Sequence, residues 1–63
     1  MKLLRLPAVL ERTGVSRSLL YLLEARGEFP RRLKLTARCV GWRSDDIEDW
    51  ITRRPRVPHK EAP

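Results

Sequence analysis

The strongest pattern along the chain is a helical spacing of leucines between residues 16 and 26. Leu19, Leu20 and Leu23 fall on one face of a helix, together with the stem of Arg26. A second face is formed by Arg17, Ser18, Tyr21 and Ala25, with Glu24 at its edge and Leu22 on its flank. The pattern predicts an amphipathic helix with one buried face and one exposed face.

Both ends of this helix carry local signals. Ser16 is a favoured N-cap because its hydroxyl can accept a hydrogen bond from an N–H group of the first turn. Val15 and Leu20 can pack together as a hydrophobic staple. Gly27 can adopt the left-handed conformation that closes a helix, and Pro30 prevents continuation. We therefore expect a helix over residues 16–26.

A shorter helix is predicted before it. Pro7 suits the first turn, where its missing N–H costs nothing, and Gly14 can close the last turn. Val9 and Leu10 would face inward. Only about three residues, 14–16, would separate the two helices, and a tight glycine-containing turn of this kind is typical of a helix-turn-helix.

After Pro30 the apolar residues change to a period of two. Leu33 and Leu35 alternate with polar positions in one segment, and Val40 and Trp42 do so in the next. Residues 36–38 would form the turn between them. The pattern predicts a β-hairpin with these apolar side chains facing inward and its cations on the other face or at the tip.

A last helix is predicted from Ser44, which we expect to be its N-cap. Asp45 and Asp46 would lie in the first turn, where the helix dipole favours anions, and Pro55 would stop the helix. Its narrow apolar stripe is formed by Ile47, Trp50 and Ile51. We expect one domain over residues 1–54, followed by a disordered, basic, proline-rich tail over residues 55–63.

Composition narrows the function classes. The 63 residues include one cysteine, Cys39, and one histidine, His59, so no disulfide, metal site or cofactor is expected. No nucleophile has a plausible base partner, so we expect neither an enzyme nor a small-molecule ligand. The longest apolar run, residues 19–23, is far shorter than the roughly 20 residues that span a bilayer, and no signal peptide is visible. We expect a soluble cytoplasmic protein.

Charge is segregated along the chain, which has a net charge of +6. Residues 31–43 contain five cations and no anion, whereas residues 45–49 contain four anions and no cation. A basic patch of this kind attracts a polyanion, most commonly nucleic acid.

Taken together, the order of elements predicts a small α+β winged helix-turn-helix that binds double-stranded DNA. The recognition helix over residues 16–26 would enter the major groove. The basic wing over residues 31–43 would contact phosphates or the minor groove, and the acidic last helix would stay away from the DNA. The predicted DNA contacts are Ser16, Arg17, Ser18, Tyr21, Arg31, Arg32, Lys34, Arg38 and Arg43, of which Ser16 fits a cap better than a contact.

Two other classes remain to be compared with this hypothesis. A protein-interaction adaptor would use the basic hairpin to bind an acidic partner and the leucine-rich helix to bind another chain. A membrane-surface peptide is disfavoured by the separated charges and the proline-rich tail.

The segments "RLPAVLERTGVSRSLLY", "GEFPRRLKL" and "VGWRSDDIEDWI" resemble the AlpA-like prophage regulators, within a larger set of small MerR-like winged-helix proteins that includes phage excisionases. The resemblance runs from about Leu3 to Arg53. It implies sequence-specific DNA binding near promoters or attachment sites, on the bacterial nucleoid, in transcription regulation, excision or both. It also suggests integrase and neighbouring copies of the chain as partners. Leu22 departs from the family, which usually has a polar residue there, so it could lower the number of DNA contacts or offer an apolar contact to a neighbouring copy.

Overall fold

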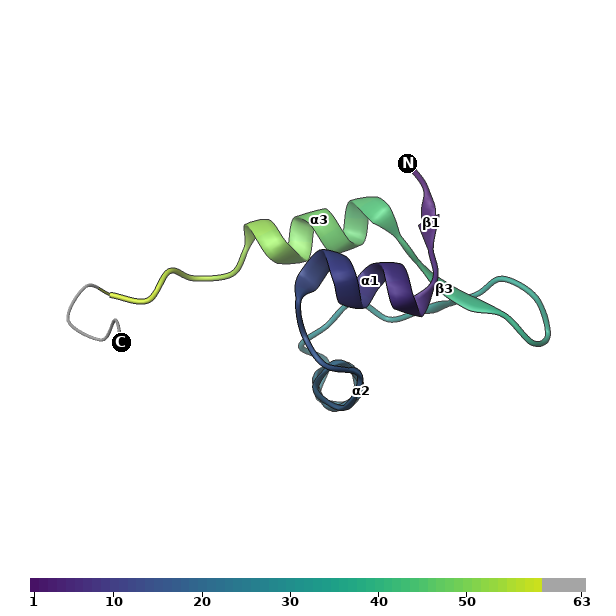
Figure 1. The fold of residues 1–63 in the computed structure, drawn as a ribbon, viewed down its shortest axis with the longest axis horizontal. Coiled ribbons are helices and arrows are strands. Elements are labelled where there is room, and N and C mark those ends of the chain that lie inside the picture. The colour runs from purple at the N-terminus through teal and green to yellow at the C-terminus, as the bar shows by residue number, and fades with distance from the viewer. Residues whose placement is uncertain (59–63) are drawn as a thin grey trace.

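The computed structural model describes residues 1–58, which form three helices around a small three-stranded sheet (Figure 1). The elements are β1 (Leu3–Leu4), α1 (Leu6–Thr13), α2 (Arg17–Ala25), β2 (Leu33–Lys34), β3 (Val40–Arg43) and α3 (Ser44–Thr52). The predicted small α+β fold and its three helices are confirmed. In this part of the chain no helix has the length and apolar character needed to cross a membrane.

The sheet has the order β1-β3-β2, with both neighbours antiparallel to β3. Leu4 is paired with Trp42 in β3, and Leu33 of β2 is paired with Gly41. The hairpin of β2 and β3 was predicted from the sequence, whereas β1 was not. Because β1 adds a second partner, β3 is the central strand, and it continues directly into α3.

Ser44 shows what β1 changes. It was predicted to cap the last helix with its hydroxyl, and that prediction is wrong. Arg43 occupies the N-cap position without a side-chain hydrogen bond. The hydroxyl of Ser44 accepts a hydrogen bond of 2.8 Å from the Lys2 backbone N–H, and the Ser44 N–H donates one of 2.7 Å to the Lys2 carbonyl. Ser44 therefore fastens the N-terminal strand to the start of α3.

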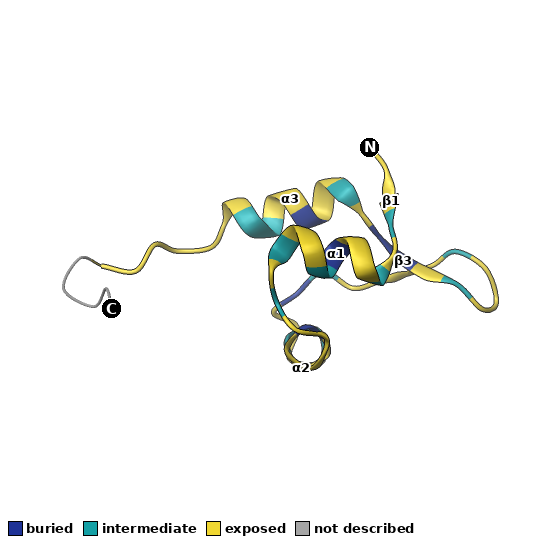
Figure 2. Cartoon of the chain, in the orientation of Figure 1, coloured by how far each residue is buried: buried dark blue, intermediate teal, exposed yellow. Residues whose placement is uncertain are grey.

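The core is thin, and every helix contributes one fully buried side chain to it (Figure 2). Its five buried apolar residues are Val9, Leu20, Phe29, Trp42 and Ile47. Partly buried side chains surround them, namely Leu4, Leu6, Leu10, Val15, Leu23, Trp50 and Ile51. The predicted inward positions of Val9 in α1 and Ile47 in α3 are thus confirmed.

Four predicted inward positions are wrong. Leu19, Leu33 and Val40 are exposed, and Arg26 is exposed as well. Leu33 is paired with Gly41, so its side chain points away from the core that Trp42 enters, because alternate strand residues face opposite sides. Val40 shares the face of Trp42 but lies where the hairpin projects beyond the helices (Figure 1).

Beyond α3 the chain runs away from the domain without regular structure through Pro58 (Figure 1). Residues 55–58 are exposed. The rest of the predicted tail, including His59, lies outside the described residues.

We predict that Gly41→Ala destabilises the fold by about 1–3 kcal/mol, because neighbouring atoms already occupy the space that the added methyl group would need. A Cβ at this position would lie 2.9 Å from the Leu4 carbonyl oxygen and 3.0 Å from Cδ1 of Leu35. In a domain of this size the loss lowers the melting temperature by about 4–8 °C for each kcal/mol. Thermal unfolding followed by circular dichroism measures the shift. The exposed neighbour Val40→Ala serves as the control, and equal melting temperatures for the two variants would contradict the packing at Gly41.

Candidate nucleic-acid interface

The turn between α1 and α2 sets the direction of α2. Gly14 has a φ of 77° and its N–H donates to the Leu10 carbonyl at 2.8 Å, which closes α1. Ser16 then starts α2, with its hydroxyl accepting from the Leu19 N–H at 3.1 Å, so the predicted cap is confirmed. In Figure 1 α2 is seen end on while α1 runs across the view, so the two helices cross.

The outward face of α2 is the one that the leucine spacing predicts. Arg17, Ser18 and Tyr21 are exposed, whereas Leu20 is fully buried. Leu22 is also exposed, at 47%, and adds an apolar side chain beside the polar ones. Hence α2 presents a mixed surface of cationic, hydroxyl, aromatic and aliphatic groups.

The C-terminal end of α2 turns the chain back toward the sheet. Gly27 has a φ of 74°, its N–H donates to the Glu24 carbonyl at 3.1 Å, and the Glu28 N–H donates to the Leu23 carbonyl at 2.8 Å. This pair of bonds is a Schellman motif, in which a left-handed glycine satisfies the last carbonyls of the helix. The chain after Gly27 can therefore return alongside α2.

The returning segment is fixed by side chains from two other elements. The indole N–H of Trp42 donates to the Pro30 carbonyl at 2.9 Å, and that of Trp50 donates to the Glu28 carbonyl at 2.8 Å. Phe29 between them is buried and meets Trp50 edge to face, with ring centroids 4.8 Å apart. These contacts lead the chain from α2 into the hairpin along a defined path.

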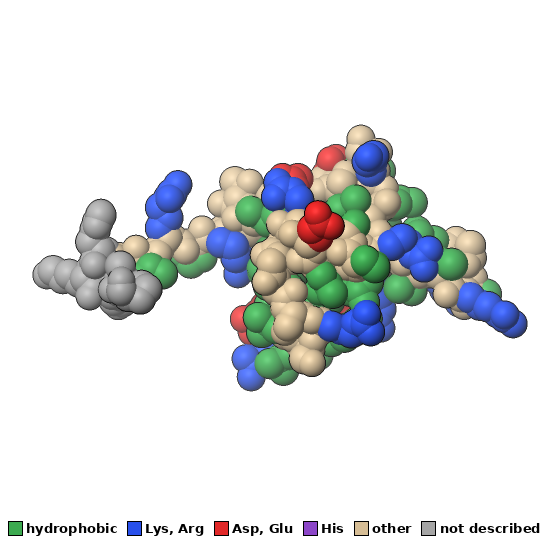
Figure 3. Space-filling view, in the orientation of Figure 1, with side chains coloured by type: hydrophobic (Ala, Val, Ile, Leu, Met, Phe, Trp, Pro, Cys, Tyr) green, Lys and Arg blue, Asp and Glu red, His purple; other side chains and the backbone are tan. Residues whose placement is uncertain are grey.

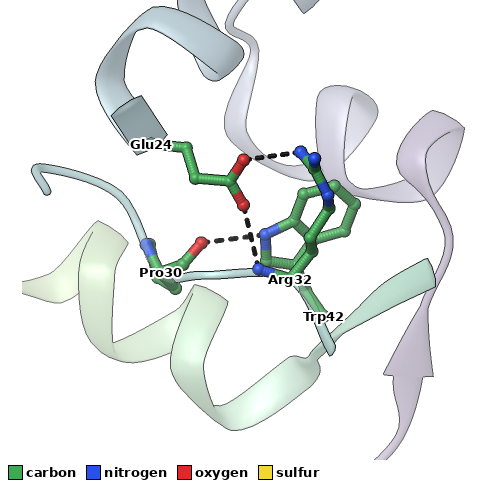
Figure 4. A network of polar contacts seen from close by, with 4 residues as sticks. All are labelled: Glu24, Pro30, Arg32 and Trp42. Atoms are coloured by element: carbon green, nitrogen blue, oxygen red, sulfur yellow. Dashed lines mark hydrogen bonds and ion pairs between the residues drawn. The ribbon is translucent and has the colours of Figure 1, made fainter. Parts of the chain in front are cut away.

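Arg32 is hydrogen-bonded to Glu24 of α2 (Figure 4), a contact that was not predicted from the sequence. Its guanidinium donates to Glu24 Oε1 at 2.6 Å, and its backbone N–H donates to Glu24 Oε2 at 2.9 Å. The same guanidinium lies over the ring of Tyr21, 5.3 Å from the centroid. Glu24 and Arg32 are eight residues apart across the Schellman turn, so no helical periodicity could have paired them.

The structure groups some of the predicted contacts. Tyr21, Arg31 and Arg32 line one shallow surface hollow together with Glu24 and Ala25. All nine predicted residues are exposed, although the Ser16 hydroxyl is occupied as a cap and Arg32 as a partner of Glu24.

The remaining wing cations are spread over the hairpin. Arg38 lies in the turn, which is closed by the Leu35 N–H donating to the Cys39 carbonyl at 2.8 Å. Lys34 is paired with Val40 and so shares the face of Trp42, whereas Arg43 alternates to the opposite face. In Figure 3 the projecting hairpin shows blue side chains without a red one beside them. A ligand that lies against one face of the sheet therefore cannot contact Lys34 and Arg43 equally.

The acidic helix is separated from α2. In Figure 1 α3 lies on the other side of α1 from α2. Glu48 forms an ion pair with Arg12 of α1, and Asp49 forms one with Arg53 at 3.0 Å. Asp46 and Asp49, however, line a hollow together with Arg31 and residues 27–30, so the end of the acidic helix borders one of the predicted DNA contacts.

Comparison with known proteins points to one family. Residues 2–55 match the family model described as prophage CP4-57 regulatory protein (AlpA). The chain is 33% identical over 62 residues to the DNA-binding transcriptional activator AlpA of Escherichia coli (strain K12), with 89% of each chain covered. It is 36% identical over 53 residues to the uncharacterized protein ORF88 of Enterobacteria phage P4. That match covers 84% of this chain and 60% of the phage protein.

Proposed function

We propose, because the chain belongs to the AlpA family of prophage regulatory proteins, that it is a DNA-binding transcription regulator with a winged helix-turn-helix. In this proposal α1 and α2 are the helix-turn-helix and the hairpin of β2 and β3 is the wing. One observation carries it: Arg17, Ser18 and Tyr21 are exposed on α2, and Tyr21 shares a surface hollow with Arg31 and Arg32, which begin a stretch of cations without an anion, residues 31–43.

Each part of this surface suits a different part of the duplex. Arg17 is in the first turn of α2, where a recognition helix meets base edges, and its guanidinium can donate two parallel hydrogen bonds to a guanine. Ser18 and Tyr21 follow on the same face. Arg31, Lys34 and Arg38 suit phosphates, which fix position without selecting sequence. The family relation supports our further proposal that the protein acts on the nucleoid in the bacterial cytoplasm.

We extend the proposal to excision with an integrase and to loading of several copies side by side. A single module of this size buries only about 600–1,000 Å² on DNA, which is thin for selecting one site among a million or more competitors. Leu19 and Leu22 expose 42% and 47% of their surfaces on α2 and offer apolar area for contact between copies.

We predict that the affinity for DNA falls steeply with salt. If Arg31, Lys34 and Arg38 each neutralise a phosphate, the slope of log affinity against log salt is about −3, since each contact contributes about −0.9. Fluorescence anisotropy with a labelled duplex at several salt concentrations gives this slope. A flat response would favour the alternative in which the hairpin binds an acidic protein.

The helix and the wing should differ in their mutational effects. Arg17→Ala is expected to weaken binding to the preferred sequence by about 1–3 kcal/mol through loss of a bidentate base contact. Lys34→Ala and Arg38→Ala are expected to weaken binding to all sequences more evenly. Competition between a selected duplex and random DNA measures the difference. If Arg17→Ala left the discrimination unchanged, its role as a base contact would be wrong.

Cooperative loading has its own test. We expect the protein to be monomeric alone and to bind with higher affinity per site when sites are repeated about one helical turn apart, which places the copies on one side of the duplex. Footprinting on duplexes with one, two and three sites compares the affinities. Equal affinity per site on all three would count against contacts between copies, and a stable dimer in sedimentation without DNA would replace them with a preformed pair.

A further inference from the structure

Glu24 and Arg32 join the recognition helix to the wing at a single point. We propose that they are a positioning pair, which holds the wing at a fixed place relative to α2, and that Arg32 serves DNA binding through this position and not as a phosphate contact. The inference rests on the proposed DNA-binding function and names residues that determine its specificity.

The Glu24 carboxylate holds Arg32 by both its main chain and its side chain. One oxygen accepts the backbone N–H at 2.9 Å and the other accepts the guanidinium at 2.6 Å. The Glu24 side chain is only 12% exposed, so water competes weakly for these bonds. Two charge-assisted hydrogen bonds to one carboxylate fix the orientation as well as the separation of the two groups.

The same short segment is also fixed from the side of the core. Two residues before Arg32, the Pro30 carbonyl accepts the indole N–H of Trp42, which belongs to the second strand of the wing (Figure 4). The chain from Pro30 to Arg32 is thus bound to β3 on one side and to α2 on the other. Because both anchors lie just before β2, the angle between α2 and the wing is set there.

Arg32 also touches Tyr21, a predicted DNA contact. Its guanidinium lies over the Tyr21 ring, which is the geometry of a cation–π interaction. Removal of Arg32 therefore frees the ring as well as the wing. The charge of Arg32 is already balanced by Glu24, the only acidic residue of α2, so the pair offers little attraction to a phosphate. Within residues 1–58 the neighbouring Arg31 makes no ion pair.

The substitution Glu24→Gln tests the positioning role of Glu24 separately from the effect of its charge, because the two predict opposite changes in DNA affinity. Loss of a carboxylate raises the net charge of +6 by one unit, which on charge alone strengthens binding to any DNA. If Glu24 positions the wing, binding to a preferred sequence weakens instead. Glu28→Gln makes the same change of charge at an exposed side chain four residues away and serves as the matched control.

The experiment uses the full chain, a duplex selected by the wild-type protein from a random pool, and a scrambled duplex. We expect Glu24→Gln to bind the selected duplex about tenfold more weakly without losing affinity for the scrambled one, a size typical of coupled residues in contact. Glu28→Gln should not lose affinity for either. A Glu24→Gln variant that binds the selected duplex as tightly as the wild type would overturn the positioning role.

The two neighbouring arginines provide the second comparison. Arg31→Gln should reduce the steepness of the salt dependence by about 0.9, as expected for one lost phosphate contact, whereas Arg32→Gln should leave the slope unchanged. The effects of Glu24→Gln and Arg32→Gln on the selected duplex should not add in the double variant. Additive effects together with a reduced slope for Arg32→Gln would make Arg32 an independent phosphate contact.

Two measurements keep folding and function apart. Circular dichroism must show that the variants keep the wild-type helix content at the temperature of the binding assay. Amide exchange without DNA tests the contact itself: the Arg32 N–H should exchange faster in Glu24→Gln than in the wild type, and equal rates would contradict it. A wild-type protein that selects no duplex would overturn the proposed function, whereas normal selection by both proteins would overturn the positioning role alone.

Discussion

The arrangement of the other elements depends on the buried indole of Trp42 and the contacts that it makes. It lies in the central strand, so both other strands are hydrogen-bonded to the strand that carries it, and α3 follows that strand without a loop. Its N–H donates to the Pro30 carbonyl, and its buried ring belongs to the same core cluster as Val9 of α1 and Leu20 of α2. A side chain of this size contributes about 3–5 kcal/mol when buried, which is comparable with the whole stability of a domain this small. The surface geometry is therefore set by a core that has little stability to spare.

The helices could be predicted because their signals are local. The cap at Ser16 and the left-handed Gly27 lie within a few residues of the bonds they make, and the leucine spacing identifies Leu20 without knowledge of the partner. The strand β1 could not be predicted in this way, since its two residues form a strand only by pairing with residues about 40 positions later. Lys2, just before β1, donates to the hydroxyl of Ser44, so a local capping rule gave the wrong cap there.

In the candidate site, too, features with local signals could be predicted, whereas features that depend on distant contacts could not. The exposure of Arg17, Ser18 and Tyr21 follows from helical periodicity alone, and the structure agrees. The sequence could identify residues 31–43 as a cationic stretch, but it could not tell which cations are free. That depends on the turn that brings Arg32 back to Glu24, and on the strand register, which a shift of one residue would reverse for every side chain of the hairpin.

The pairing of β1 with β3 has a consequence for synthesis on the ribosome. Residues 3 and 4 leave the ribosome well before their partners at positions 42 and 43, which are made about 40 residues later. The segment that forms α2 has all its capping groups once Glu28 has emerged, so helical structure can appear there while β1 still has no partner. β1 is thus made before β3 but can pair only after β3 has emerged, and this pairing completes the sheet around Trp42.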